Sequence, residues 1–371
     1  MAQSHHHEVV VGSQLRKARE SVGLSLSEAA ARLGIPIPSL VEWESARGEP
    51  ELAQLELLSE IYGRGVDYFL RPTPDDPMFY EFRTPTRGPS SDLSLEARVI
   101  TSRFEELCRK SNQLDELLDR QRTIQVPTVA PGEGTVQLAH RIRKLLGADG
   151  KPIRNLRRSL TVRGIRVFEL PVPSGEFSGL SSTNHTYGPR ILVNARDPFG
   201  RRHFTLAHEL AHLVYQHSAS LCLVSPDWRT SHTRLERAAD RFAVEFLMPA
   251  DPVLEDARGL SSRKPAIPEI GRLANRWRVS FEAIGYRLEE LRVIEEDLTT
   301  GLLESYLAAP IRRRGPRKTT WERQLGDDYV GDALKAYRRG RISIGKLANF
   351  LGIPLRRAFR LVEQGGSGKD Q

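Results

Sequence analysis

Two histidines and a glutamate stand in an order that could hold and use a metal ion. His208 and His212 are four residues apart, and Glu209 directly follows the first histidine. On a helix, residues i and i+4 lie on one face about one turn apart, so both imidazoles can share one tetrahedral zinc. Glu209 can then act as general base towards a water at that metal. The spacing predicts a zinc-dependent hydrolase, with satisfied, buried histidines as the alternative.

A third metal ligand is expected on a later helix. Glu236 follows His212 by 24 residues, and its helix carries apolar residues on the packing side. A carboxylate among such residues is costly to bury unless a cation pairs with it. Asp240 shares the face of Glu236 at i+4 and is expected to orient a ligand histidine by accepting its second N–H. On spacing alone, Glu236 could instead be a solvated acid beside Arg234 or Arg237.

The runs around these residues carry a family resemblance. RRHFTLAHELAHLVYQH and ERAADRFAVEFLMP, with SGL at 178–180, ILVNARDPFGRR and VSFEAIGYRLEEL, resemble the ImmA/IrrE family of zinc metallopeptidases over roughly residues 135–295. The resemblance implies that zinc is bound by His208, His212 and Glu236. It implies that Glu209 is the general base.

The elements that must position these residues follow from hydrophobic periodicity. Helices are expected near 201–217 and 232–248, and strands near 162–170 and 190–194. An edge strand near Ser178–Ser181 is expected to pair with an extended substrate backbone. The oxyanion-stabilising residue is not fixed by the pattern, and the candidates are His185, Tyr187, His217 and His232.

Residues 9–72 form a separate module that resembles an XRE-type helix-turn-helix domain of five helices. Ser25 and Glu28 make a capping box, and Gly34 ends the helix that it opens. Base-reading positions of such domains fall here on Ile37, Pro38, Val41 and Glu42, which are poor partners for base edges or phosphates. A scaffold that contacts the peptidase or a protein partner is therefore preferred over sequence-specific DNA binding.

The charge of the chain is unevenly distributed. Its 371 residues carry a net charge of +8. Residues 1–72 hold 7 basic and 10 acidic side chains, a net of −3, whereas residues 310–371 hold 15 and 6, a net of +9. Phosphate attraction is the main non-specific contribution to DNA affinity, so any nucleic acid is expected at the C-terminal region.

That C-terminal region interleaves basic and aromatic residues. Such a pattern suits single-stranded nucleic acid, with a solvated helical face as the alternative. The segment ISIGKLANFLGIPLRRAFRLV reads as another helix-turn-helix-like pair and resembles the tail of longer family members, but no internal repeat is expected. The candidate nucleic-acid contacts are Arg312, Arg313, Arg314, Arg317, Lys318 and Trp321.

Cysteine usage and hydropathy bound the class of protein. The chain has two cysteines, Cys108 and Cys222, which excludes a disulfide framework and favours a reducing cytoplasm. No secretory signal or membrane-spanning run is apparent. We hypothesise that the Cys108 thiolate occupies the fourth zinc position and inhibits the enzyme, with an ordinary buried cysteine as the alternative.

Together these features predict a mostly α protein with a small α+β zincin-like metallopeptidase core, an N-terminal five-helix XRE-like domain and a helical C-terminal region. The expected domains are 9–72, a linker and helical segment at 73–134, the peptidase at 135–300 and the basic region at 310–364.

The resemblance also bears on the substrate. It implies cleavage of a transcriptional repressor, itself XRE-like and encoded nearby, which would release stress, phage-defence or mobile-element genes. The architecture is similar to that of CapP-type peptidases of anti-phage operons, and stimulation by single-stranded DNA is a hypothesis. The alternatives are an XRE-type DNA-binding regulator or antitoxin with a non-catalytic zinc site, and a zinc-dependent binding module. The oligomeric state is left open.

Overall fold

A computed structural model describes residues 2–70, 93–120, 127–173, 175–182, 188–216, 220–222, 233–308 and 320–366. The chain divides into two compact units. The all-helical unit combines residues 1–80, 91–122 and 325–371, and the sheet unit combines residues 81–90 and 123–324.

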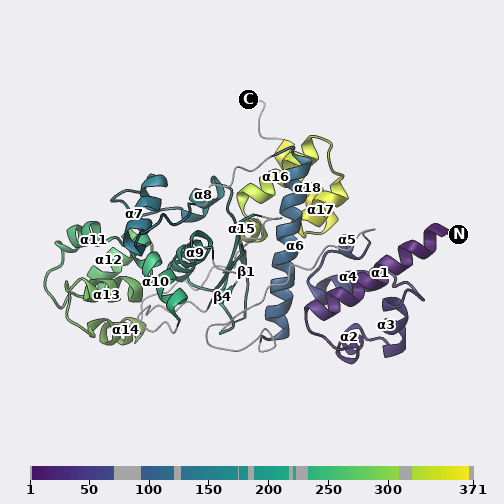
Figure 1. Ribbon diagram of the computed structural model, residues 1–371, viewed down its shortest axis with the longest axis horizontal. Coiled ribbons are helices and arrows are strands. Elements are labelled where there is room, and N and C mark those ends of the chain that lie inside the picture. Colours follow the sequence, from purple (N-terminus) through teal and green to yellow (C-terminus); the bar gives the residue numbers. More distant parts are fainter. Residues whose placement is uncertain are drawn as a thin grey trace. The chain divides into compact units, whose positions relative to one another are not determined.

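The all-helical unit is built from the two ends of the chain and one long central helix. In Figure 1 the long helix α6 runs beside the C-terminal helices, drawn in yellow. The helices are α1 (Ala2–Ser21), α2 (Leu26–Leu33), α3 (Ile37–Glu44), α4 (Leu52–Tyr62), α5 (Val66–Phe69), α6 (Leu95–Leu117), α16 (Asp327–Arg338), α17 (Ile344–Leu351) and α18 (Leu355–Gly366).

The first five helices form the expected N-terminal domain, and its caps are those that the sequence predicts. Ser25 accepts a hydrogen bond from the Glu28 amide, and the Glu28 carboxylate accepts one from the Ser25 amide. Gly34 ends α2 in the left-handed region at φ 68°. Apolar residues of α1 to α5 close one core around the buried Leu15, Leu40 and Phe69.

Long-range polar contacts bind the C-terminal helices into the same unit. Asn349 of α17 donates a hydrogen bond to Asp67 of α5 at 2.9 Å, and its carbonyl accepts one from Lys110 of α6 at 2.8 Å. Arg120, which follows α6, forms a two-pronged ion pair with Asp332 of α16. Residues 9–72, 73–134 and 310–364 are expected from the sequence as separate segments, because such distant pairings leave no local pattern.

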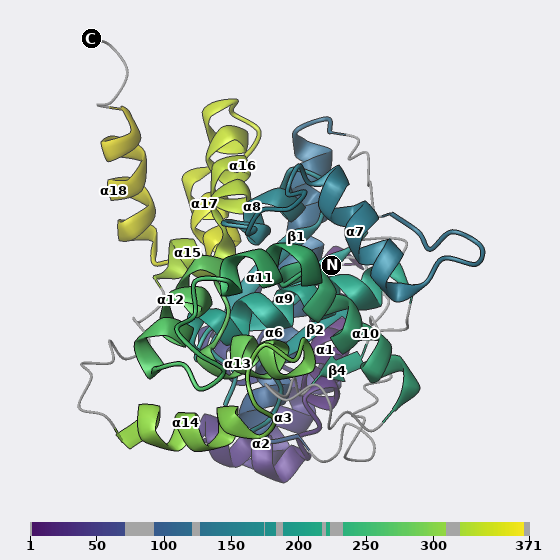
Figure 2. The same cartoon turned by 90° about the vertical axis from the view of Figure 1, so that its left-hand side faces the viewer.

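The sheet unit surrounds a four-stranded sheet with helices, and in Figure 2 α9 lies among α10, α11 and α13. The strands are β1 (Arg166–Leu170), β2 (Gly179–Ser182), β3 (Arg190–Asn194) and β4 (Ser220–Cys222). The helices are α7 (Thr135–Leu145), α8 (Leu156–Thr161), α9 (Phe199–Val214), α10 (Arg234–Leu247), α11 (Ala250–Ala257), α12 (Ile267–Trp277), α13 (Phe281–Glu290), α14 (Leu298–Ala308) and α15 (Trp321–Leu325), of which Leu325 is assigned to the other unit.

The order of strands corrects one expectation. The sheet runs β1-β3-β2-β4, with β1 parallel to β3 and the other neighbouring pairs antiparallel. Gly179 of β2 lies opposite Val193 on one side and Cys222 on the other. The strand near Ser178–Ser181 is therefore internal and not an edge, because the three-residue strand β4 pairs with its second side.

The fold class is confirmed: the protein is mostly α with a small α+β core. α9 packs on β2 and β3 and against α10. Its apolar face joins a continuous core with Ile191, Val193 and Phe242. No described helix has both the length and the apolar character needed to cross a bilayer.

Candidate metal centre

Two packed helices carry the candidate metal ligands. α9 presents His208 and His212 one turn apart, at 1% and 2% exposure. α10 begins at its N-cap Thr233, whose hydroxyl accepts a hydrogen bond from the Glu236 amide at 3.2 Å. This cap fixes the first turn of α10, and Glu236 projects from that turn towards the histidines.

The three ligand atoms converge on one point. Nε2 of His208 lies 3.0 Å from Nε2 of His212 and 3.1 Å from Oε2 of Glu236, and Nε2 of His212 lies 3.6 Å from Oε1 of Glu236. Zinc bonds of about 2.0–2.1 Å in a tetrahedron place ligand atoms about 3.3 Å apart. Two imidazoles and one carboxylate at these separations fit a zinc ion with a fourth position open.

Asp240 fixes the orientation of one ligand ring. Its Oδ1 lies 2.8 Å from Nδ1 of His208, and the side chain is 3% exposed. An Nδ1–H that donates to this carboxylate leaves the Nε2 lone pair for a metal. Within the described part of the chain, His208, His212 and Glu236 form the group that could hold a metal ion.

Buried neighbours shift the proton affinity of both glutamates. Burial alone would raise the pKa of Glu236, but its contacts with His208 and His212 outweigh burial and bring that pKa well below its usual range. Glu209 is completely buried, and burial raises its pKa, with partial compensation from the two imidazoles and Ser181. Neither Glu209 oxygen has a hydrogen-bond partner of good geometry among the described residues.

Strand β2 packs closely against Glu209 at Gly179. A Cβ added at Gly179 would lie 2.6 Å from Oε1 of Glu209 and 2.5 Å from Cγ2 of Thr205, both closer than real contacts allow. The glycine therefore lets the strand approach α9 and leaves room for the carboxylate. In the sequence, Gly179 stands out only as part of the Ser178-Gly179-Leu180 resemblance, and nothing in that resemblance indicates its contact with Glu209.

The other candidate site residues lie away from the candidate metal ligands in the chain or outside the described residues. Cys108 is completely buried on α6 of the all-helical unit, whereas the candidate metal ligands belong to the sheet unit, and the inhibitory role stays a prediction. Trp321 begins α15. Outside the described residues lie Arg312, Arg313, Arg314, Arg317 and Lys318, and the oxyanion candidates His185, Tyr187, His217 and His232.

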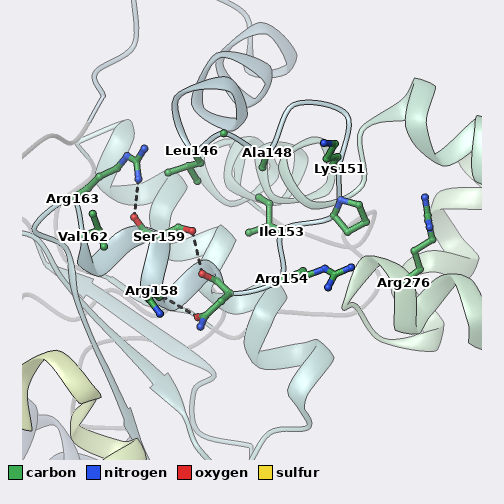
Figure 3. Close-up of a pocket in the computed structure, with 13 residues that line it drawn as sticks. Leu146, Ala148, Lys151, Ile153, Arg154, Arg158, Ser159, Val162, Arg163 and Arg276 are labelled. Carbon is green, nitrogen blue, oxygen red and sulfur yellow. Dashed lines mark hydrogen bonds between the residues drawn. The ribbon is translucent and has the colours of Figure 1, made fainter. Parts of the chain in front are cut away.

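The sheet unit also has a basic pocket of about 750 Å³ apart from the metal-site residues (Figure 3). Its lining includes five cations and no carboxylate. Buried Arg143 holds its rim, donating to the carbonyls of Ala148 and Lys151, and also to the carbonyl of Phe246 on α10. The cations are Lys151, Arg154, Arg158, Arg163 and Arg276.

Two segments of the chain match known protein families. Residues 160–289 match the IrrE N-terminal-like domain of the peptidase M78 family, and this range contains the metal-site residues. Residues 15–69 match a helix-turn-helix family. No curated protein matches the chain.

Proposed function

We propose that this chain, an ImmA/IrrE-type peptidase that carries an XRE-type helix-turn-helix domain, is a zinc-dependent endopeptidase that cleaves a transcriptional repressor. The observation that carries the proposal is the convergence of His208, His212 and Glu236 beside the buried carboxylate of Glu209. A structural metal site has no need for a buried base with unmatched oxygens next to its ligands, whereas a hydrolase does.

The residues of the chain divide the work of hydrolysis. A zinc ion held there supplies Lewis acidity, which polarises the scissile carbonyl and acidifies the attacking water. Glu209 accepts the proton of that water and returns it to the leaving amine, and its raised pKa suits both transfers. Asp240 holds the His208 ring in the ligating orientation throughout.

The sheet offers a place for an extended substrate. β4 is the last described strand on the β2 side of the sheet, so its outer edge, and not that of β2, is where a peptide backbone would add. The XRE-like domain suits a partner protein, because Ile37 and Pro38 are exposed and apolar at positions that usually read bases. A repressor with a similar domain, encoded nearby, is the proposed substrate.

The test is incubation of the protein with the neighbouring repressor. Glu209→Gln should abolish cleavage while bound zinc stays at the wild-type level, because the residue is the base and not a ligand. Glu255→Gln, an exposed acid on α11 of the same unit, should cleave normally. Cleavage that survives Glu209→Gln would exclude this mechanism. Absence of cleavage by the wild type would favour the alternative, a DNA-binding regulator or antitoxin with a non-catalytic zinc site.

Regulation by single-stranded DNA is a further part of this proposal. It rests on the run of basic residues from Arg312 to Lys318 beside Trp321. Adding single-stranded DNA should raise the rate of repressor cleavage in the wild type. It should not do so after Arg312, Arg313, Arg314, Arg317 and Lys318 are replaced by glutamine, a change that keeps α16–α18 in the chain. An unchanged rate in the wild type would remove this part of the proposal and leave the peptidase assignment intact.

A further inference from the structure

The C-terminal helices α16, α17 and α18 repeat α1, α2 and α3 after 318 residues, without insertion or deletion from Leu15 to Glu44. This corrects the expectation that the chain has no internal repeat. Six of the twelve positions from Ser25 to Pro36 are identical in the second copy. Ser25, Ala30, Leu33, Gly34, Ile35 and Pro36 recur as Ser343, Ala348, Leu351, Gly352, Ile353 and Pro354.

The turns between the paired helices have the same hydrogen bonds. Each second helix opens with a serine cap that accepts from the amide three residues on, at 3.2 Å in both copies. Each ends at a left-handed glycine, with φ 68° at Gly34 and 61° at Gly352. The next amides, of Ile35 and Ile353, both donate to the alanine carbonyl five residues back, at 3.1 Å.

The buried positions also correspond. Ala18 of α1 and Ala336 of α16 are both fully buried, and so are Leu40 of α3 and Ala358 of α18. The second copy is anchored in its unit, because the Tyr329 hydroxyl of α16 donates to a carbonyl of α17 at 3.0 Å. α16 to α18 therefore form a second helix-turn-helix with the backbone pattern of the first.

The two copies differ in the helix that would face a nucleic acid. α3 carries two glutamates and no basic residue, a net charge of −2, whereas α18 carries three arginines and one glutamate, a net of +2. At the base-reading positions, Ile37, Pro38, Val41 and Glu42 of the first copy are replaced by Leu355, Arg356, Phe359 and Arg360. All four residues of the second copy are exposed.

We propose that α16–α18 binds double-stranded DNA, with the start of α18 in the major groove. Arg356 and Arg360 lie one turn apart on the exposed face of α18, where a guanidinium can donate two hydrogen bonds to O6 and N7 of guanine. Phe359 supplies the apolar surface that contacts thymine methyl groups. The chain thus carries two helix-turn-helix modules, of which the C-terminal one has the charge and the side chains for reading DNA.

Selection from a pool of 30-base-pair duplexes with a randomised centre, on the full-length protein, tests this proposal. An enriched sequence motif is expected from the wild type. Arg356→Gln/Arg360→Gln should weaken binding of the enriched duplex at least about tenfold, since each guanine contact contributes that order of discrimination. Two control variants are compared with it. Arg154→Gln/Arg158→Gln removes the same charge from the sheet unit and so controls for net charge. Glu42→Gln changes the corresponding helix of the first copy.

Both controls should bind within about twofold of the wild type, and all variants should melt at the wild-type temperature because the substituted side chains are exposed. Three results would overturn the proposal: no enriched motif, equal affinity of Arg356→Gln/Arg360→Gln and the wild type for the selected duplex, or an equally large loss of affinity of this variant for the separated single strands. Binding is measured without cleavage, so the outcome is independent of the proposed peptidase activity.

Discussion

The carboxylate of Asp240 lies 2.8 Å from Nδ1 of His208, and both side chains are almost completely buried. This pair joins α9 to α10 at the point where the two helices supply the candidate metal ligands. The buried acid fixes which ring nitrogen faces the metal position, so it is expected to govern metal affinity without touching the metal.

Replacing this acid should weaken metal binding. Asp240→Ala is expected to lower zinc affinity by about 10–100-fold, measured by competition with a chromogenic chelator, because the His208 ring loses its partner. Asp240→Asn keeps an acceptor oxygen, so its zinc affinity should lie between those of the wild type and Asp240→Ala. Asp251→Ala, an exposed acid on α11, serves as the control. An Asp240→Ala protein with unchanged affinity would show that ring orientation is set elsewhere.

Filling the space behind the general base should impair catalysis specifically. Gly179→Ala would place a methyl group 2.6 Å from Oε1 of Glu209, so either the carboxylate or β2 must move. We expect the cleavage rate to fall at least about tenfold, since such misplacement of a catalytic group is costly. Bound zinc should be unchanged, because the ligands lie elsewhere. Gly271→Ala on α12, where an added methyl meets open space, should cleave at the wild-type rate.

A buried histidine should make the fold acid-sensitive. His203 is 5% exposed, its Nδ1 lies 2.8 Å from the Arg278 carbonyl, and burial lowers its pKa to about 4. The unfolded chain takes up this proton first, near pH 6.5, so the contribution of neutral His203 to stability is present above pH 6.5 and is lost as the pH falls towards 4. The loss amounts to about 3 kcal/mol.

Urea unfolding of the wild type and His203→Asn, compared at pH 7.5 and at several values down to pH 4.5, measures this loss. Asparagine can still donate to the carbonyl but does not titrate in this range. The stability difference between the two proteins should shift in favour of the variant as the pH falls. A difference that is constant with pH would contradict the prediction.

A buried ion pair should be the most sensitive point in the packing of α10 against α13. Nη2 of Arg287 lies 2.9 Å from Oε1 of Glu245, and the two side chains are 1% and 4% exposed. Arg287→Met leaves the Glu245 charge buried without this partner and should cost about 3–5 kcal/mol in chemical unfolding. Adding Glu245→Gln should recover part of the loss. Arg272→Met, at a 74% exposed side chain, should cost less than about 1 kcal/mol.

The sequence by itself determined the features that depend on local helix geometry. Histidines at i and i+4 must share a face in any helix, and a serine three residues before a glutamate, just ahead of an apolar helical pattern, is a local signal for a helix start. The positions of His208, His212 and Glu209, the helices that carry them and the N-terminal five-helix domain could therefore be predicted. The spacing alone could not assign Glu236 as a ligand, since its distance from His212 along the chain is also compatible with a solvated acid.

Only the tertiary structure decided the relationships between distant segments. The three-residue strand β4 makes β2 internal, and Gly179 lies against Glu209 because the sheet packs on α9. The assembly of α6 and α16–α18 with the N-terminal helices rests on pairs more than 200 residues apart, such as Lys110 with Asn349. The repeat of α1–α3 was also recognised from the structure. Half of the positions in its best-matched stretch differ in sequence, whereas the serine cap, the turn and the buried positions agree.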